Sequence, residues 1–146
     1  MPTHAEKKRL PYTPAEMFDL VADIEKYPEF LPWCVGTRIR SREGSLVVAD
    51  MIIGYKMFRE SFTSRVTLSK PDRIDVEYFD GPFKYLHNHW IFEPDGKGTC
   101  IDFFVDFEFK SRILQAMIGV VFGEAVRIMV NAFERRAETV YGKRVI

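Results

Sequence analysis

The chain of 146 residues has the length of one ordinary domain, and its 47% hydrophobic residues are enough for one substantial core. Lysine plus arginine equals aspartate plus glutamate at 21 each, so no global charge favours nucleic acid or an anionic surface, and any such attraction has to come from a local patch. Two cysteines, Cys34 and Cys100, without a CxxC motif or a Cys/His cluster, indicate neither a disulfide framework nor a zinc site and favour a reducing cytoplasm.

The N-terminal residues do not predict a targeting segment. The stretch "MPTHAEKKRL" has no apolar core, and it has too few arginines and serines for a transit peptide. The longest nearly uncharged run, Ile113–Gly123, is well short of the roughly 20 residues of a membrane span. We therefore expect a single cytoplasmic domain over residues 1–146 that does not cross a bilayer.

The first predicted elements are a strand and a short helix. The helix begins at "TPAE", where Thr13 and Glu16 form a T-x-x-E capping box with Pro14 at the first helical position. Its buried side consists of four apolar residues, Phe18, Leu20, Val21 and Ile24. Two prolines in the following "YPEFLPWC", residues 27–34, prevent a long continuation, so this apolar segment is expected to be irregular.

From Val35 the sequence period changes to two, and turn signals separate successive strands. The turns are "REG", "KPD", "DGP" and "DGKG", at residues 42–44, 70–72, 80–82 and 95–98. Alternation puts apolar side chains on one face and charged ones on the other, so one face of the sheet should be core and the other wet. The predicted inner positions include Val35, Thr37, Ile39, Phe62, Val66, Leu68, Ile74, Val76, Tyr78, Ile101, Phe103, Val105, Phe107 and Phe109.

The last predicted element is a long helix. Near Ser111 the period becomes helical and stays so to about Tyr141, which predicts a helix about 45 Å long at about 1.5 Å per residue. The order is a strand, short helices, about six antiparallel strands and this helix. That order predicts an α+β fold with the helices on one face of the sheet.

Five segments of the chain resemble one known family. They are "RLPYTPAEMFDLVADIEKYPEFLPWC", "ESFTSRVTL", "GPFKYLHNHWIFEP", "FEFKSRIL" and "MVNAFERRAETVYG". They are similar, in the same order from about Leu10 to Gly142, to the coenzyme Q-binding proteins of the polyketide-cyclase/START-like superfamily. The resemblance implies a helix-grip fold, in which a curved antiparallel sheet of about six to seven strands wraps a long C-terminal helix around an apolar cavity.

The resemblance also implies a function. Members of the family hold ubiquinone or a related prenyl lipid and act as lipid chaperones for respiration or quinone biosynthesis, without catalysis and without a catalytic cofactor. We therefore expect a cytoplasmic protein that is peripheral to the inner membrane. A homodimer is a further possibility. Bacterial relatives are also known as ribosome-association toxins, so association with the large ribosomal subunit is an alternative, and an aromatase/cyclase-type enzyme is a third.

The two-residue period and the resemblance together predict the ligand-binding residues. The strands contribute their inward-facing residues, among them the amide of Asn88. The long helix contributes its inner stripe, and "YPEFLPWC" contributes the rim of the cavity. The predicted residues are Tyr27, Phe30, Leu31, Trp33, Leu86, Asn88, Trp90, Phe103, Val105, Phe107, Leu114, Ile118 and Phe122.

Two interpretations of "YPEFLPWC" stay open at this point. Its prolines set the path of the backbone at low entropic cost, so its large side chains can line the mouth of a lipid cavity. The same side chains can instead form a plug that closes one end of an ordinary core. The family resemblance favours the mouth.

Few residues suggest chemistry. His87 and His89 form an HxH, but alternation points them to solvent and no third ligand is indicated, so we expect no metal. Asn88 falls on the inner face, where a buried amide needs a partner, either a quinone oxygen or a neighbouring backbone group. No GxSxG, HExxH or phosphate-binding glycine loop is present, and we expect no enzyme activity.

One local basic patch is predicted on the outer face of the sheet. Arg38, Arg40 and Arg42 share a strand face, beside Arg59 and Arg65 if neighbouring strands pair in a meander. The patch could meet ribosomal RNA or lipid phosphates, but interleaved acidic residues favour an ordinary charged surface. RNA recognition would also need exposed aromatic side chains, and none is evident there.

The outer face of the long helix changes character along its length. A polar stripe through Glu124, Arg127, Asn131, Glu134 and Glu138 continues toward the N-terminus as Ile113, Met117 and Val120. Exposed apolar residues of this kind mark a membrane or partner surface. Gly119 and Gly123 each cost about 1 kcal/mol relative to alanine, so this half is expected to bend and to act as a membrane-touching gate. A second subunit or "YPEFLPWC" itself could instead cover these residues.

Overall fold

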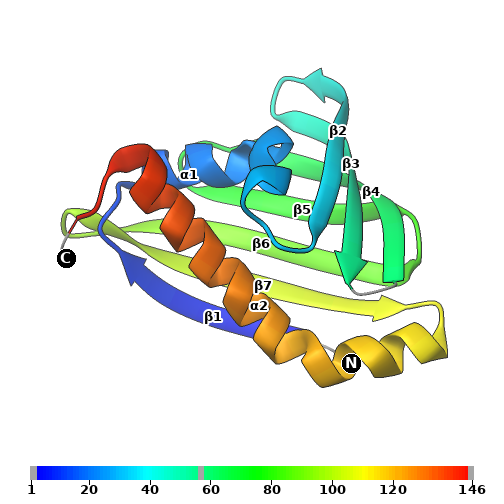
Figure 1. The fold of residues 1–146 in the computed structure, drawn as a ribbon. Coiled ribbons are helices and arrows are strands. Elements are labelled where there is room, and N and C mark those ends of the chain that lie inside the picture. Colours follow the sequence, from blue (N-terminus) through cyan, green and yellow to red (C-terminus); the bar gives the residue numbers. More distant parts are fainter. Residues whose placement is uncertain (1–2, 56–57, 145–146) are drawn as a thin grey trace.

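A computed structural model of the chain describes residues 3–55 and 58–144 (Figure 1). A curved sheet of seven antiparallel strands lies behind the C-terminal helix, and two short helices cover the end of the sheet next to that helix. The elements in chain order are β1 (Thr3–Leu10), α1 (Pro14–Ala22), the 3-10 helix η1 (Ile24–Glu29), β2 (Cys34–Glu43), β3 (Leu46–Tyr55), β4 (Phe58–Ser69), β5 (Arg73–Asp80), β6 (Phe83–Asp95), β7 (Gly98–Phe109) and α2 (Arg112–Tyr141).

The strands lie in the order β1-β7-β6-β5-β4-β3-β2, so β2 to β7 form a meander and β1 closes onto β7. The pairing register confirms the predicted alternation: Val66, Val76, Asn88 and Val105 lie opposite one another on four successive strands. Their side chains therefore share one face of the sheet. That concave face meets α2 and forms most of the hydrophobic core.

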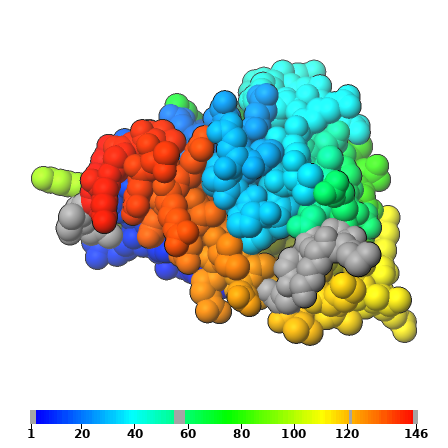
Figure 2. Space-filling view, viewed as in Figure 1, coloured from blue at the N-terminus to red at the C-terminus, as the bar shows by residue number. Residues whose placement is uncertain are grey.

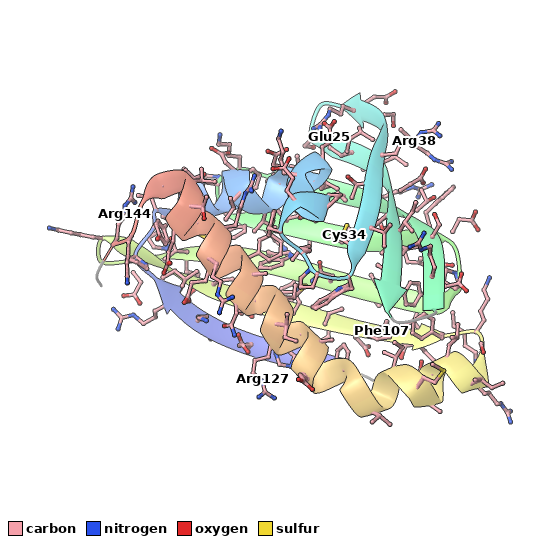
Figure 3. The ribbon with its side chains drawn as sticks, in the orientation of Figure 1. Glu25, Cys34, Arg38, Phe107, Arg127 and Arg144 are labelled. Carbon is pink, nitrogen blue, oxygen red and sulfur yellow. The ribbon has the colours of Figure 1, made fainter. Side chains whose placement is uncertain are left out.

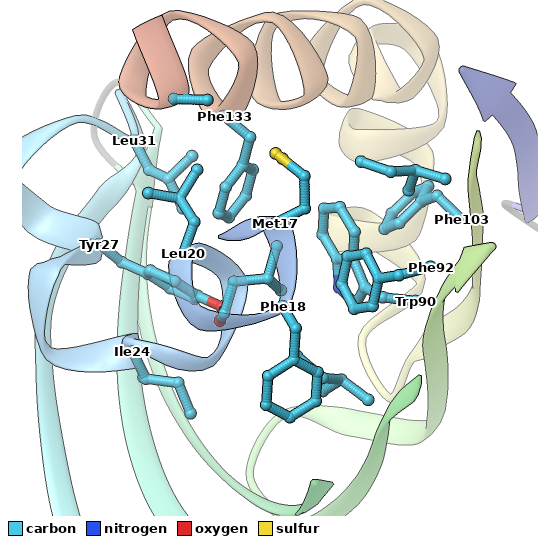
Figure 4. Close-up of a cluster of buried hydrophobic side chains, with 14 of the residues drawn as sticks. Met17, Phe18, Leu20, Ile24, Tyr27, Leu31, Trp90, Phe92, Phe103 and Phe133 are labelled. Carbon is cyan, nitrogen blue, oxygen red and sulfur yellow. The ribbon is translucent and has the colours of Figure 1, made fainter. Parts of the chain in front are cut away.

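Helix α1 begins as the capping box predicts. The Thr13 hydroxyl accepts a hydrogen bond from the Glu16 backbone N–H at 3.1 Å, and the Glu16 carboxylate accepts one from the Thr13 N–H at 2.9 Å. Both orphan donors of the first turn are thereby satisfied. Met17, Phe18 and Val21 on its inner side are buried, and Figure 4 shows Met17 and Phe18 beside Trp90 and Phe92 of the sheet.

The first half of "YPEFLPWC" differs from the prediction of an irregular segment. It completes η1, a short 3-10 helix that contains Pro28. The Tyr27 ring packs at 5.5 Å and the Phe30 ring at 5.1 Å from the Phe133 ring of α2, both edge to face. Figure 2 shows this part of the chain (blue) directly against the middle of α2 (orange). Packing of Tyr27 and Phe30 on Phe133 therefore stabilises η1, which the local sequence does not favour.

The start of β2 also differs from prediction. Val35 was expected on the inner face, but it is 44% exposed, whereas Cys34 is buried. The cause is a register shift between Cys34 and Gly36 relative to β3. A bulge inserts one residue into a strand and so reverses the faces on its two sides, which simple alternation does not anticipate.

Helix α2 has the predicted length of 30 residues but is not straight (Figure 1). The parts Arg112–Val120 and Phe122–Tyr141 are bent by 63° relative to each other. The bend falls between Gly119 and Gly123, as the sequence predicts. Within the described ranges no single helix is long and apolar enough to span a membrane, and only the two bent parts of α2 taken together satisfy that test by length and composition.

The C-terminal end of α2 is tied to α1. Arg144 forms a two-pronged ion pair with the Glu16 carboxylate at 2.6 and 2.9 Å, and the Tyr141 hydroxyl donates to the Glu16 carbonyl at 2.8 Å. The hydrogen bond from Arg144 and the contacts with Thr13 hold the pKa of Glu16 below its ordinary value of 4.5, although burial opposes the shift. The ionised carboxylate is thus the form that the fold favours.

Glu16→Gln is expected to lower the melting temperature at pH 7, because glutamine keeps the cap but loses the ion pair with Arg144. The folded-state pKa of Glu16 is lowered, so the ion pair stabilises the protein above pH 4.5 and loses its effect as the pH falls through the lowered value. The difference between variant and wild type should therefore shrink between pH 5 and pH 3 in calorimetric scans. A difference of the same size at pH 3 and pH 7 would contradict this account.

Candidate ligand cavity

A cavity of about 470 Å³ lies between the concave face of the sheet, η1 and α2. Strands β3 to β7 form its floor, and Figure 4 shows Trp90 and Phe103 on the side of the sheet that faces α2. In Figure 3, Cys34 and Phe107 likewise lie on elements that border this space, whereas Arg127 points away from it. The interior is therefore not filled solidly by side chains, and its volume is in the usual range for a small-molecule site.

The cavity contains nearly all the residues that the sequence predicted for it. They come from β6, β7, α2, η1 and the segment after η1, and those that line it are Tyr27, Leu31, Trp33, Leu86, Asn88, Trp90, Phe103, Val105, Phe107, Ile118 and Phe122. Their contact with a ligand stays a prediction. Sequence reasoning placed Phe62 and Val66 of β4 on the inner face but missed Ala49 and Ser64 in the same floor, because small side chains leave no periodic apolar signal.

Two of the predicted residues lie outside the cavity. Phe30 packs between the Phe133 ring and the guanidinium of Arg136, 5.1 Å from each. Leu114 packs instead on a separate cluster of Phe83, Phe107 and Phe109 at the far end of the sheet. Ile118, one turn further along the same part of α2, packs against this cluster and also lines the cavity, so Leu114 lies just beyond the cavity's end.

The mouth of the cavity is formed by three segments. The lining residues that reach the surface are Trp33 from "YPEFLPWC", Gly54 from the end of β3, and Glu124 and Ile128 from α2. The Trp33 carbonyl accepts a hydrogen bond of 2.8 Å from the Gly54 N–H, which ties two sides of the mouth together. Both interpretations of "YPEFLPWC" therefore apply to different parts of it: the first aromatics anchor the segment on α2, and its second half borders the mouth.

The chemistry of the lining is simple. Apolar side chains dominate, and none of the lining residues is a lysine, arginine or histidine within the part of the chain that the structure describes. The half-buried amide of Asn88 has a backbone partner, since its Nδ2 donates to the Phe104 carbonyl at 2.7 Å. Glu124 is the charged lining residue and is exposed at the mouth. Such a site suits a largely apolar, uncharged molecule.

The two histidines of the HxH point away from the cavity, as predicted. The His89 ring stacks on Phe104 at 5.3 Å, and its Nε2 lies 3.8 Å from Asp102 Oδ1. His87 stacks on Tyr85 in the same way, at 5.9 Å. Across residues 3–55 and 58–144, no group of three or more metal-ligating side chains is found.

The first part of α2 exposes its outer face. Ile113, Met117 and Val120 are 74%, 50% and 87% exposed, so "YPEFLPWC" does not cover them. They form one stripe at helical spacing just N-terminal to the bend and to the mouth residues of α2. We call these three residues the apolar stripe.

The outer face of the sheet carries the predicted basic residues, but partly neutralised. Arg40 Nε lies 2.8 Å from Asp50 Oδ2, and Arg38 acts on the same carboxylate. The expectation that this face lacks exposed aromatics is wrong: Phe79 is 54% exposed, and the Arg65 guanidinium lies 4.5 Å from the centre of its ring. The face therefore combines cations with one stacking surface.

Comparison with known proteins agrees with this geometry. The model of the family described as polyketide cyclase / dehydrase and lipid transport matches residues 10–134. The chain belongs to this family. The match includes η1, the whole sheet except most of β1, and α2 through the residues that border the cavity.

Two relatives within the family are named for binding or association rather than for a reaction. The chain is 42% identical over 137 residues to the ribosome association toxin RatA of Rickettsia prowazekii, a match that spans 91% of this chain and 94% of the relative. It is 32% identical over 148 residues to the mitochondrial coenzyme Q-binding protein COQ10 homolog B of Xenopus laevis, spanning 98% of this chain and 61% of the relative.

Solved structures share the fold. A START superfamily protein from Mycobacterium smegmatis superposes with a TM-score of 0.80 at 19% identity, covering 94% of this chain and 98% of that one. The chain thus has a START-like fold, with the predicted curved sheet around a C-terminal helix.

Cys34, a lining residue of this family member, is expected to resist alkylation. Burial raises the pKa of its thiol to about 11, and only the thiolate reacts. With a free cysteine pKa of about 8.5, reaction with iodoacetamide at pH 8 should be about 200-fold slower than for free cysteine and should accelerate as the pH rises toward 11. Peptide mass spectrometry after timed labelling measures this, with half-buried Cys100 as internal comparison. Labelling of Cys34 at the rate of free cysteine would contradict its placement.

Proposed function

We propose that this protein binds ubiquinone or a related prenyl lipid in the cavity and carries it to membrane-bound respiratory or biosynthetic enzymes without catalysing a reaction. The observation that carries the proposal is an apolar cavity of about 470 Å³ with a mouth beside α2. The name of the Xenopus laevis relative supports the choice of ligand. The protein would act in the cytoplasm, at the surface of the inner membrane.

The lining favours binding over catalysis. An aromatase/cyclase-type enzyme would need a positioned acid or base inside the cavity. The carboxylate that borders the cavity, Glu124, is exposed, and the lining residues Ser64 and Asn88 do not ionise near neutral pH. Burial raises the pKa values of the Tyr27 hydroxyl and the Cys34 thiol, so both stay protonated at that pH. Apolar burial with few polar contacts is the arrangement of a lipid carrier.

Extraction of the purified protein tests the proposal. The protein, isolated without detergent from a host that makes ubiquinone, is extracted with organic solvent, and the extract is analysed by mass spectrometry. A prenyl quinone in at least a substantial fraction of the molecules is expected, and its amount should fall in a variant whose cavity is filled. An extract without prenyl quinone, together with no binding of added decylubiquinone, would refute the proposal.

Association with the large ribosomal subunit is the second candidate. The name of the Rickettsia prowazekii relative supports it, and so does the outer face of the sheet, where Arg38, Arg65 and exposed Phe79 could contact RNA. Co-sedimentation with 50S subunits at two salt concentrations tests it. Binding that is lost in Arg38→Glu/Arg65→Glu but kept in Arg73→Glu would favour this function, since Arg73 is paired with Asp75.

A further inference from the structure

The hydroxyl of Ser64 is the unusual polar group of the core. The buried polar residues of the described chain are Thr63, Ser64 and Thr99. Thr63 donates to Asp50 Oδ1 and Thr99 to the Tyr12 carbonyl, each at 2.5 Å. Ser64 is only 6% exposed, and its Oγ has no hydrogen-bond partner in the described part of the protein. A buried hydroxyl left unpaired opposes folding, so its presence calls for a partner outside the chain.

Ser64 faces the cavity beside another small side chain. It lines the cavity from β4, directly opposite Ala49 of β3, which lines it too. The neighbouring inward side chains on the same strands are larger, for example Met51, Phe62 and Val66. Two small side chains next to each other make a recess in the floor, and the unpaired hydroxyl lies in it.

A second polar group faces the same cavity from β6. Asn88 Nδ2 donates to the Phe104 carbonyl, and because a carbonyl only accepts, this bond assigns the nitrogen to that contact. Nδ2 carries two hydrogens, so its second N–H is still able to donate to the cavity that Asn88 lines. Only β5 separates the strands of Ser64 and Asn88, so the two polar groups lie on one side of an otherwise apolar chamber.

We propose that Ser64 and Asn88 hold the head group of the bound lipid, and that this head group is uncharged and carries a carbonyl oxygen that accepts the Ser64 hydrogen bond. The inference rests on the proposed lipid-binding function and specifies which lipids the cavity selects. Fatty acids and phospholipids have anionic heads, and no basic side chain lines the described cavity to pair with them. A neutral ring with carbonyl oxygens can accept the hydrogen bond of the Ser64 hydroxyl without a charge being buried in the cavity.

Two probes with the same tail test the selection: decylubiquinone, which has the carbonyl oxygens, and decylbenzene, which lacks them. Both tryptophans of the chain, Trp33 and Trp90, line the cavity, so their fluorescence reports quinone binding and its displacement by decylbenzene. Wild-type protein should bind the quinone at least about 10-fold more tightly than decylbenzene. In Ser64→Ala quinone affinity should fall about 5-fold, the value of one neutral hydrogen bond, while decylbenzene affinity stays the same.

The melting temperature of the ligand-free protein separates a ligand role from a structural one. Ser64→Ala removes an unpaired buried hydroxyl, so its melting temperature should equal or exceed that of wild type. The matched control is Ser61→Ala, an exposed position on the same strand, which should change neither affinity nor melting temperature. Asn88→Leu, if folded by circular dichroism, should lose part of the same preference for the quinone.

The outcomes distinguish failure of the head-group assignment from failure of the proposed lipid-binding function. If wild type binds both probes with equal affinity, or if Ser64→Ala keeps the full preference for decylubiquinone, the head-group assignment is wrong while apolar binding stands. A fall in the melting temperature of ligand-free Ser64→Ala would likewise overturn it, because the hydroxyl would then have a structural partner. If wild type binds neither probe, the proposed function itself fails.

Discussion

Ala49→Phe is expected to abolish decylubiquinone binding while the protein remains folded. Ala49 is a buried residue in the floor of the cavity, and its side chain points at the space between sheet and helix. A phenyl ring at this position occupies the recess beside Ser64. In a solid core such overpacking costs about 1–3 kcal/mol. Here the ring enters a cavity of about 470 Å³, so the loss of stability should be smaller.

Fluorescence titration of Ala49→Phe with decylubiquinone should show at least about a 100-fold loss of affinity, because the blocked volume excludes the ring of the ligand. Thermal unfolding of the same sample verifies the fold. Ala5→Phe is the matched control: it makes the same substitution at an exposed strand position and should bind as wild type does. Unchanged affinity in a folded Ala49→Phe protein would show that the ligand binds elsewhere.

Met117→Lys combined with Val120→Lys is expected to abolish membrane association. Both residues belong to the apolar stripe and are at least half exposed, so lysine meets water there and folding should be nearly unaffected. Insertion of this stripe among lipid headgroups would bury apolar area, and two lysines would oppose it. Flotation with liposomes of neutral phospholipid should fall to background, and transfer of decylubiquinone between vesicles should slow by about 10-fold or more.

The control for this pair adds the same charge elsewhere. Leu46→Lys with Val140→Lys changes two exposed apolar residues that lie outside the apolar stripe, and flotation should persist. If the Met117 and Val120 variant floats and transfers quinone like wild type while remaining a folded monomer, the stripe is not a membrane contact. If wild type is a dimer and this variant a monomer, a second subunit covers the stripe instead.

The position of the apolar stripe suggests how lipid could pass. The bend of 63° separates the stripe from the second part of α2, which supplies Glu124 and Ile128 to the mouth. Gly119 and Gly123 flank the bend, and a Cβ at either glycine would meet no neighbouring atom. We propose that the first part of the helix acts as a gate that swings at this bend when the stripe contacts a membrane.

The sequence alone determined the elements whose signals are local. The capping box at Thr13 predicted the start of α1, and the change of period near Ser111 predicted α2 from end to end. In β6 and β7 strict alternation predicted the cavity face, including Trp90 and Phe103. Such patterns suffice because each residue's environment follows from the geometry of its own helix or strand.

Only the tertiary structure decided what depends on contacts between distant segments. Phe30 packs on α2 and not in the cavity, the bulge near Cys34 turns Val35 outward, and Leu114 packs on Phe83, Phe107 and Phe109. The missing hydrogen bond of Ser64 is also visible only in the tertiary structure. A serine in a strand gives no signal in the sequence, and its lack of a partner is known only once the positions of the surrounding polar groups are known. Bulges, helix bends and missing hydrogen bonds are relations between elements, and periodicity within one element carries no record of them.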